Sequence, residues 1–249
     1  MSEKQTSTGA GANERPLVAI QVPTTASEKP SIVADAGSDG TPYAFVPRAT
    51  LTINSLGISW FRFPRSVKEL TIPILRDSTP AYQSVRFKRS SGSCVLTSLH
   101  PTATEVARTQ YTFGPGKKRA PVVTIAGEEL RIFKACVSHR KYTFQWRGER
   151  YEWIYEKEER PATASSEGGV LKTKLLVLYV GEGETRRKVA ELVRNRETRT
   201  TGSGSTWAGN GGALVLGEGV EEVVVVATVL VMLKKEVDRR ILQQIVLIY

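Results

Sequence analysis

Cysteine and histidine are scarce in this sequence, which has two of each in 249 residues. Two cysteines are too few for a disulfide scaffold, and neither has a second cysteine nearby for a zinc knuckle. We expect Cys94 and Cys136 to be buried free thiols, with a single disulfide between them as the alternative. His100 and His139 belong to neither a Gly-x-Ser-x-Gly elbow nor a His-Glu-x-x-His pair. The sequence therefore predicts no metal site, no cofactor and no enzyme of the hydrolase or zinc classes.

A hydrophobic run long enough to cross a membrane is also lacking. The longest apolar stretch, Val223–Leu233, contains Thr228 as its one polar residue. As a helix it would measure about 16 Å, roughly half of a ~30 Å hydrocarbon layer. No secretory leader follows Met1, and the ends carry neither a myristoylation nor a prenylation motif. We therefore expect an intracellular protein in the cytoplasm, with peripheral membrane association as a further option.

The same stretch predicts an element that is buried on all sides, because it leaves no face for water. Its four successive valines, Val223–Val226, favour a strand by propensity. The flanking charges favour a helix, since two glutamates precede the stretch and lysines and arginines follow it, as the helix dipole prefers. We predict a helix over about 220–240, with two short strands as the alternative. Ile241–Tyr249 is again largely apolar, so we expect the C-terminus to be tucked in as well.

The rest of the chain divides into a tail and one β-rich domain. Residues 1–40 are rich in Ser, Thr, Gly, Ala and Glu, and predict a disordered N-terminal tail. Residues 41–249 are enough for one domain with its own core. From Tyr43 onwards, short runs alternate between apolar and polar residues and are separated by Gly, Pro, Ser and Asn, which is typical of antiparallel strands.

Thirteen runs are predicted to be strands, and two stretches of linker composition, Glu158–Gly169 and Thr198–Gly212, are predicted to be surface loops. The predicted strands are Leu51–Asn54, Ile58–Phe63, Val67–Leu75, Tyr82–Arg89, Cys94–Leu99, Arg108–Phe113, Val122–Ala126, Leu130–Val137, Lys141–Trp146, Arg150–Tyr155, Leu171–Val180, Val189–Arg194 and Leu214–Leu216.

The clearest single element is a hairpin over Tyr142–Tyr155, with Arg147 and Gly148 as a two-residue turn. This register pairs aromatic side chains across the two strands on one face, where each pair stabilises by about 0.2–1 kcal/mol. We interpret this face as part of the core; the alternative is a platform on which a ligand stacks. The predicted facing pairs are Tyr142 with Trp153, Phe144 with Tyr151, and Trp146 with Glu149.

A chain of about a dozen strands that ends in one apolar helix resembles the tubby C-terminal-like fold. In that fold, a closed antiparallel β-barrel surrounds a hydrophobic C-terminal helix, and closure removes the sheet edges. Four stretches also resemble a fungal family of uncharacterised proteins with this fold: the hairpin segment Arg147–Trp153, the strands Leu171–Tyr179 and Val189–Arg194, and the helix Glu221–Leu233. The resemblance covers about residues 40–240. Tubby proteins proper bind phosphoinositides through surface lysines and arginines, but no such ligand is carried over to a position of this chain.

The chain is basic, and the excess charge lies in its middle. Residues 41–160 hold twenty Lys and Arg against ten Asp and Glu, which equals the whole formal net charge of +10. This excess favours an anionic partner. By strand alternation, Arg86 and Lys88 share one face. The alternative for each cluster is an ordinary solvated face. The candidate anion-binding residues are Arg86, Lys88, Arg89, Lys117, Lys118, Arg119, Arg140 and Lys141, and a further cluster is Arg186, Arg187 and Lys188.

Together these features predict a non-catalytic binding module whose basic rim associates with anionic lipid headgroups or with an acidic protein partner. The alternative is a nucleic-acid-binding β-barrel, which needs aromatic side chains exposed among the basic residues. Here most aromatic residues are assigned to core faces. An enzyme with a site inside the barrel is a third option, but a helix that fills the lumen would leave it little room.

Overall fold

The computed structural model of the chain describes residues 45–59, 71–87, 91–112, 119–135, 140–161, 170–204 and 206–246. The chain divides into two units, Met1–Thr41 and Pro42–Tyr249. The predicted tail, residues 1–40, lies outside the described residues, as do Cys136 and His139, and the architecture below is that of the second unit.

One antiparallel sheet of thirteen strands makes up most of this unit. Its strands are β1 (Pro47–Ile53), β2 (Thr71–Arg76), β3 (Thr79–Arg86), β4 (Cys94–Ser98), β5 (Thr104–Gln110), β6 (Val122–Ile125), β7 (Glu128–Arg131), β8 (Phe133–Lys134), β9 (Lys141–Trp146), β10 (Glu149–Pro161), β11 (Val170–Val180), β12 (Arg187–Arg194) and β13 (Gly212–Gly217). A 3-10 helix, η1 (Gly183–Thr185), precedes β12, and the chain continues after β13 into the helix α1 (Glu222–Val246).

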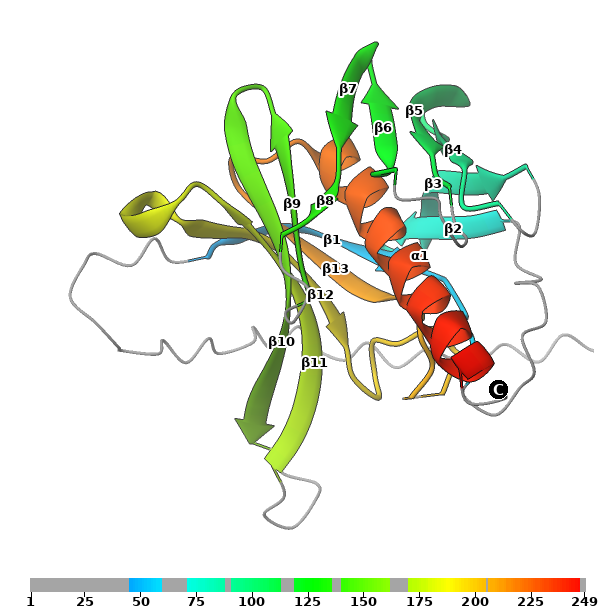
Figure 1. Ribbon diagram of the computed structural model, residues 1–249, viewed down its shortest axis with the longest axis vertical. Coiled ribbons are helices and arrows are strands. Elements are labelled where there is room, and N and C mark those ends of the chain that lie inside the picture. The colour runs from blue at the N-terminus through cyan, green and yellow to red at the C-terminus, as the bar shows by residue number, and fades with distance from the viewer. Residues whose placement is uncertain are drawn as a thin grey trace, which may run out of the picture. The chain divides into compact units, whose positions relative to one another are not determined.

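The sheet curls around α1 into a nearly closed barrel (Figure 1). Its strand order is β7-β6-β5-β4-β3-β2-β1-β13-β12-β11-β10-β9-β8. The two outermost strands, β7 and β8, follow each other in the sequence, and β7 also lies against β9. The two ends of the sheet therefore meet, which leaves little exposed edge. The predicted fold, a mainly β barrel around a C-terminal helix, is confirmed.

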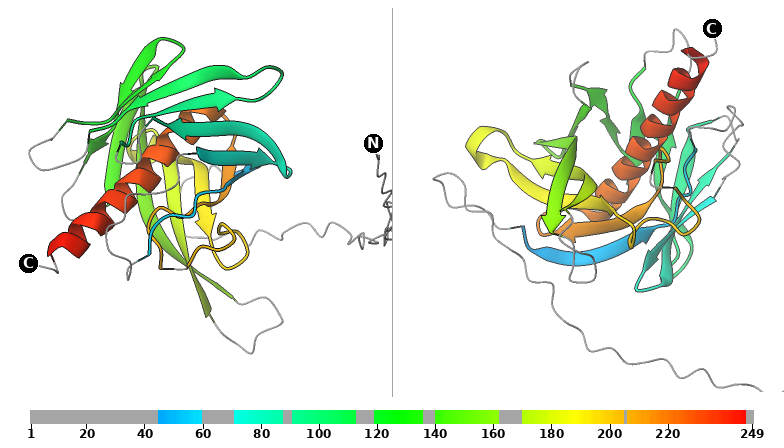
Figure 2. Two further views of the ribbon diagram at one scale, coloured as in Figure 1. Left: turned by 90° about the vertical axis from the view of Figure 1, so that its right-hand side faces the viewer. Right: turned by 90° about the horizontal axis from the view of Figure 1, so that it is seen from below.

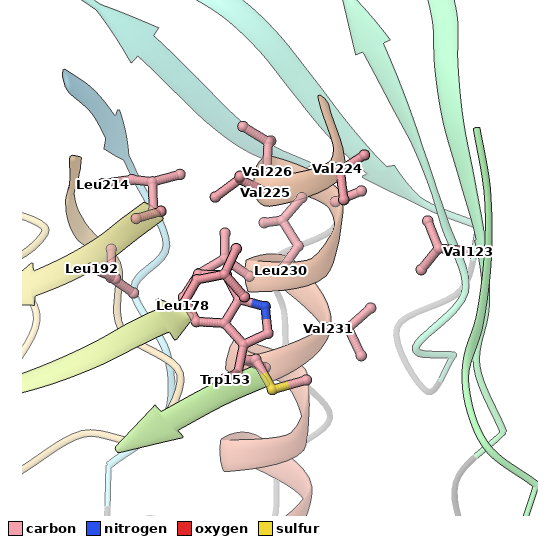
Figure 3. Close-up of a cluster of buried hydrophobic side chains, with 14 of the residues drawn as sticks. Val123, Trp153, Leu178, Leu192, Leu214, Val224, Val225, Val226, Leu230 and Val231 are labelled. Atoms are coloured by element: carbon pink, nitrogen blue, oxygen red, sulfur yellow. The ribbon is translucent and has the colours of Figure 1, made fainter. Parts of the chain in front are cut away.

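Helix α1 is the centre of the core, as the apolar stretch predicts. Every residue from Val224 to Lys234 is buried. In Figure 3, the side chains of Leu178, Leu192 and Leu214 lie on one side of the helix and Val123 lies on the other. Each such apolar side chain stabilises the fold by about 1.5–3 kcal/mol when fully buried. The apolar stretch is therefore a helix, as predicted, and not the two short strands that were the alternative. Apolar neighbours surround it on all sides.

The polar residue within the apolar stretch is fully hydrogen-bonded. Thr228 is completely buried; its hydroxyl donates to the Val224 carbonyl at 2.7 Å and accepts from the indole N–H of Trp153 at 3.0 Å. Trp153 is itself completely buried on β10. This pair satisfies both polar groups inside an otherwise apolar lumen, where an unpaired donor would be costly.

Two expectations about the C-terminus are wrong. Helix α1 continues to Val246, past the predicted end at about 240, because no Gly or Pro interrupts Ile241–Val246. Within the predicted Ile241–Tyr249 stretch, Leu242, Ile245 and Val246 are not tucked in, since they are 46 %, 40 % and 76 % exposed, and 247–249 lie outside the described residues. The last turns extend beyond the ends of the strands (Figure 2). In the part of the chain described here, no helix is apolar over enough length to cross a membrane.

The predicted hairpin is present with the predicted register. Arg147 and Gly148 both have positive φ, 47° and 81°, which matches the right-handed twist of the flanking strands. Phe144 and Tyr151 stack across it with 5.1 Å between ring centroids. Both rings are buried, as is Trp153. The core interpretation of this face is confirmed.

Other strand predictions need correction at their boundaries. The predicted loop Glu158–Gly169 begins too early, because β10 runs to Pro161 and pairs with β11 down to Val170. The predicted strand Leu130–Val137 is interrupted at Ile132, which separates β7 from β8. Ile58 forms an isolated bridge to Ala208. Residues 60–70, which contain parts of two further predicted strands, lie outside the described residues.

Candidate functional site

A pocket of about 470 Å³ lies beside the C-terminal half of α1 and is lined by seven charged side chains. Five cations and two carboxylates line it, an excess of three positive charges. We call it the arginine pocket. Its charged residues are Arg140 before β9, Glu156 and Lys157 on β10, Arg194 at the end of β12, and Glu236, Arg239 and Arg240 on α1.

The floor of the pocket is a buried ion pair. The Nη1 atom of Arg194 lies 2.7 Å from Oε2 of Glu236, and the two side chains are 7 % and 8 % exposed. The same Glu236 oxygen accepts the backbone N–H of Gly209 at 2.9 Å. Burial favours a neutral carboxyl, but Arg194 outweighs it and the pKa of Glu236 is lowered. Glu236 is therefore a carboxylate at neutral pH.

Strand alternation explains why Arg194 points inward. Leu192, two residues earlier on β12, is completely buried in the core, and residues two apart lie on the same face. The inner face of β12 is thus apolar at Leu192 and ends with Arg194, at the end of the barrel where the arginine pocket lies. The Nε atom of Arg194 is buried and has no hydrogen-bond partner among the described residues. This N–H is therefore a buried donor in the floor of the pocket, without a partner in the part of the chain that the structure describes.

Three guanidinium groups, those of Arg140, Arg239 and Arg240, lie near one another in the outer part of the pocket. Burial first, and then the positive charges of Arg239 and Arg140, lower the pKa of Arg240. Arg240 donates to the Thr206 carbonyl at 3.1 Å, and Arg140 lies over the ring of Tyr155 at 5.8 Å. Among the described residues, neither Arg140 nor Arg239 has a carboxylate within ion-pair distance. Like charges held together without such compensation favour a bound anion.

Two groups of the pocket, Tyr155 and Glu236, have shifted pKa values that hold them in their ordinary protonation states at neutral pH. The pKa of Tyr155 is raised well above its ordinary value by burial and then by the nearby Glu236, so the phenol stays protonated. Glu236 is paired, and Glu156 accepts the hydroxyl of Tyr179 at 3.0 Å. In the described part of the chain, no group of three or more His, Cys, Asp and Glu residues is placed to hold a metal ion.

The structure brings one sequence-predicted candidate, Arg140, into this pocket. Arg86 is 8 % exposed and lies on the inner face of β3, because Ser84 on the same face is also buried. It is therefore not part of a basic rim. Arg119 is exposed outside the strands, and Lys141 forms an ion pair with Glu152 at 2.5 Å. The remaining candidates, which are Lys88, Arg89, Lys117 and Lys118, lie outside the described residues.

Two members of the further cluster that the sequence indicates, Arg186 and Lys188, are compensated by nearby carboxylates. Arg186 lies 3.4 Å from Glu152 and only 3.8 Å from the centre of the Tyr179 ring. Lys188 forms an ion pair with Glu191 at 2.5 Å. Paired surface cations of this kind have little charge left for an external anion. The thiol of Cys94 is buried and free, as expected.

Sequence reasoning missed Arg194, Arg239 and Arg240. The two helix arginines were assigned to the negative end of the helix dipole, a role that any exposed cation there would fill. Their spacing from Glu236, three and four residues, was an available signal because it places all three on one side of the helix. Arg194 gave no signal, since a final strand residue of this kind is usually exposed.

Comparison with known proteins identifies no relative: no protein family, no curated protein and no solved structure matches the chain. The geometry of the arginine pocket is therefore the basis for a functional proposal.

Proposed function

We propose that this protein is a non-catalytic binding module that holds a multiply charged anionic group, such as a phosphate ester, in the arginine pocket. The observation that carries the proposal is the crowding of Arg140, Arg239 and Arg240 beside a buried arginine with an unused N–H. A phosphate offers several acceptor oxygens, and arginine binds such groups through two parallel hydrogen bonds.

The group could be the phosphate of a lipid headgroup or the carboxylates of an acidic protein partner, and arginine binds both through two parallel hydrogen bonds. The protonated Tyr155 and the paired Glu236 argue for binding over catalysis, because neither can accept a proton readily at neutral pH. The barrel around a central helix supports the proposed membership of a tubby-like family, and a lipid headgroup as ligand would imply the intracellular, peripheral membrane location that we propose.

The test is titration calorimetry with inositol trisphosphate and with inorganic phosphate as probes. We expect the trisphosphate to bind more tightly, because more of its charge can meet the pocket cations. The double variant Arg140→Gln/Arg239→Gln should lower the affinity by about tenfold or more, since a hydrogen bond to a charged group contributes about 1.5–3 kcal/mol. Equal affinity of the variant and the parent for the trisphosphate would contradict the proposal.

The matched control is Arg48→Gln/Arg119→Gln, which removes the same charge from exposed positions outside the pocket. Its affinity should stay within about twofold of the parent's at 0.15 M salt, where distant exposed charges are screened. The pocket variant should also be no less stable than the parent without ligand, because it relieves repulsion around Arg240. Loss of binding in the control as well would mean that only diffuse charge is involved.

A further inference from the structure

The last described turn of α1 exposes three apolar side chains and buries one amide, while Gln243 is exposed as an amide usually is. Gln244 is buried and donates from its amide to the Ser59 carbonyl at 3.1 Å. Leu242, Ile245 and Val246 are exposed instead, at 46 %, 40 % and 76 %. A surface helix normally turns its apolar side chains toward the core and its amides toward water. The exposure of the three apolar side chains indicates that this face meets something other than water.

These three side chains form one patch, which we call the apolar tip. Leu242 is three residues from Ile245 and four from Val246, spacings that place side chains on the same helix face. The patch lies where α1 projects past the strands (Figure 2). Its three side chains are exposed, in contrast to an apolar residue that lies between strands.

The surroundings of the apolar tip are positively charged. Arg239 and Arg240, which line the arginine pocket, precede Leu242 by three and two residues. The sequence contains no acidic residue after Asp238. Apolar side chains that project beside arginines are the arrangement of helices that enter the headgroup region of an anionic membrane. The arginines would contact phosphates while the apolar side chains pass below them.

We infer that the end of α1 inserts the apolar tip into the interface of an anionic lipid bilayer, with a headgroup in the arginine pocket. The inference rests on the proposed function for the headgroup, whereas the insertion has its own test. A second copy of the chain fits the patch less well. A two-fold contact through the apolar tip would bring Arg239 and Arg240 of both copies together, and each chain carries a formal charge of +10.

The experiment is flotation with vesicles of phosphatidylcholine alone and with vesicles that also contain phosphatidylserine. We expect the parent to float with the anionic vesicles. The variant Ile245→Ser/Val246→Ser should bind them about tenfold or more weakly, because it removes two exposed apolar side chains that would enter the membrane. Its affinity for soluble inositol trisphosphate should not change. The control Val46→Ser/Phe87→Ser alters two side chains of similar exposure, 55 % and 59 %, and should float like the parent.

Insertion depth provides a second readout. Tryptophan fluorescence of the variant Val246→Trp should be quenched by lipids with brominated acyl chains more strongly than that of the variant Val46→Trp. Equal quenching, or undiminished flotation of the Ile245→Ser/Val246→Ser variant, would overturn the inference. A dimer in sedimentation that this variant abolishes, with no vesicle binding by the parent, would overturn it in favour of a second copy.

The outcomes separate the two proposals. Flotation that depends on the apolar tip, without binding of soluble trisphosphate, would contradict the pocket function and leave insertion standing. Binding of trisphosphate without any flotation would contradict insertion and support the pocket function. It would also favour an acidic protein partner as the source of the anionic group.

Discussion

Helix α1 has two enclosed segments that are buried in different ways, Val224–Leu233 (the apolar half) and Lys234–Asp238 (the charged half). From Val224 to Leu233, the neighbours are apolar side chains on every side (Figure 3). From Lys234 to Asp238, the buried residues include three charged ones, each of which needs a particular partner. Lys234 pairs with Asp238, and Glu236 pairs with Arg194.

The two halves contribute differently: the apolar half stabilises the fold, and the charged half arranges the charges that we propose to bind an anion. The apolar half stabilises the fold through the area that it buries, which depends on size and shape and little on identity. The charged half gains little net stability from its ion pairs, because desolvation offsets their attraction. What it provides is a fixed arrangement of charge at the mouth of the barrel, where the arginine pocket lies.

The largest effect is expected from a charge in the apolar half. Val226 is completely buried, so Val226→Asp would place a carboxylate there without a partner, and the protein should no longer fold. Circular dichroism and soluble yield would measure this loss. The control Ile245→Asp puts the same charge on the exposed tip and should remain folded. A soluble Val226→Asp protein as stable as the parent would show that this half is not the core.

A smaller but still large effect is expected from breaking the buried ion pair. Glu236→Gln leaves Arg194 charged in a buried site and should lower the free energy of unfolding by about 3–5 kcal/mol, measured by urea unfolding at pH 7. The control Glu105→Gln breaks a pair whose two side chains are 44 % and 48 % exposed, and should cost at most about 1 kcal/mol. Equal losses of unfolding free energy in the two variants would show that the buried ion pair matters no more to stability than the exposed one.

The same pair predicts a pH dependence. The folded-state pKa of Glu236 is lowered, so its contribution to stability is present above the unfolded value of about 4.3 and is lost as the pH falls through the folded value. The parent should therefore lose more stability between pH 7 and pH 3 than the Glu236→Gln variant does. Parallel losses for both proteins would contradict the lowered pKa.

The smallest effect is expected at the polar residue within the apolar half. Thr228→Val removes the acceptor of the Trp153 indole N–H and should lower the free energy of unfolding by about 1–3 kcal/mol. Thr228→Ser keeps the hydroxyl and loses a methyl group, for about 0.8 kcal/mol. Thermal unfolding of the two variants measures the difference. A valine variant that is more stable than the serine variant would show that the hydrogen bond contributes little.

Much of the fold could be predicted because its signals are local. The alternation of short runs predicted most strands, and the Arg147-Gly148 turn fixed the register of its hairpin. The boundaries of the strands were harder to predict. Strand β10 runs to Pro161 through residues with loop composition, because pairing with β11 outweighs the local preference of these residues for a loop. Of the candidate site, only Arg140 was foreseen, since the others carried charges that local reasoning assigns to solvent.

The sequence by itself determined that an apolar element near the C-terminus had to be enclosed and that many antiparallel strands would enclose it. Both follow from the local pattern of apolar and polar residues, which shows where water can reach the chain. Only the tertiary structure decided which charges would meet. Arg140, Arg194 and Glu236 are far apart in the sequence, and the curling of the sheet around α1 brings them to one pocket. The interaction of charges depends on the distance between them in space, and no local pattern of residues encodes that distance.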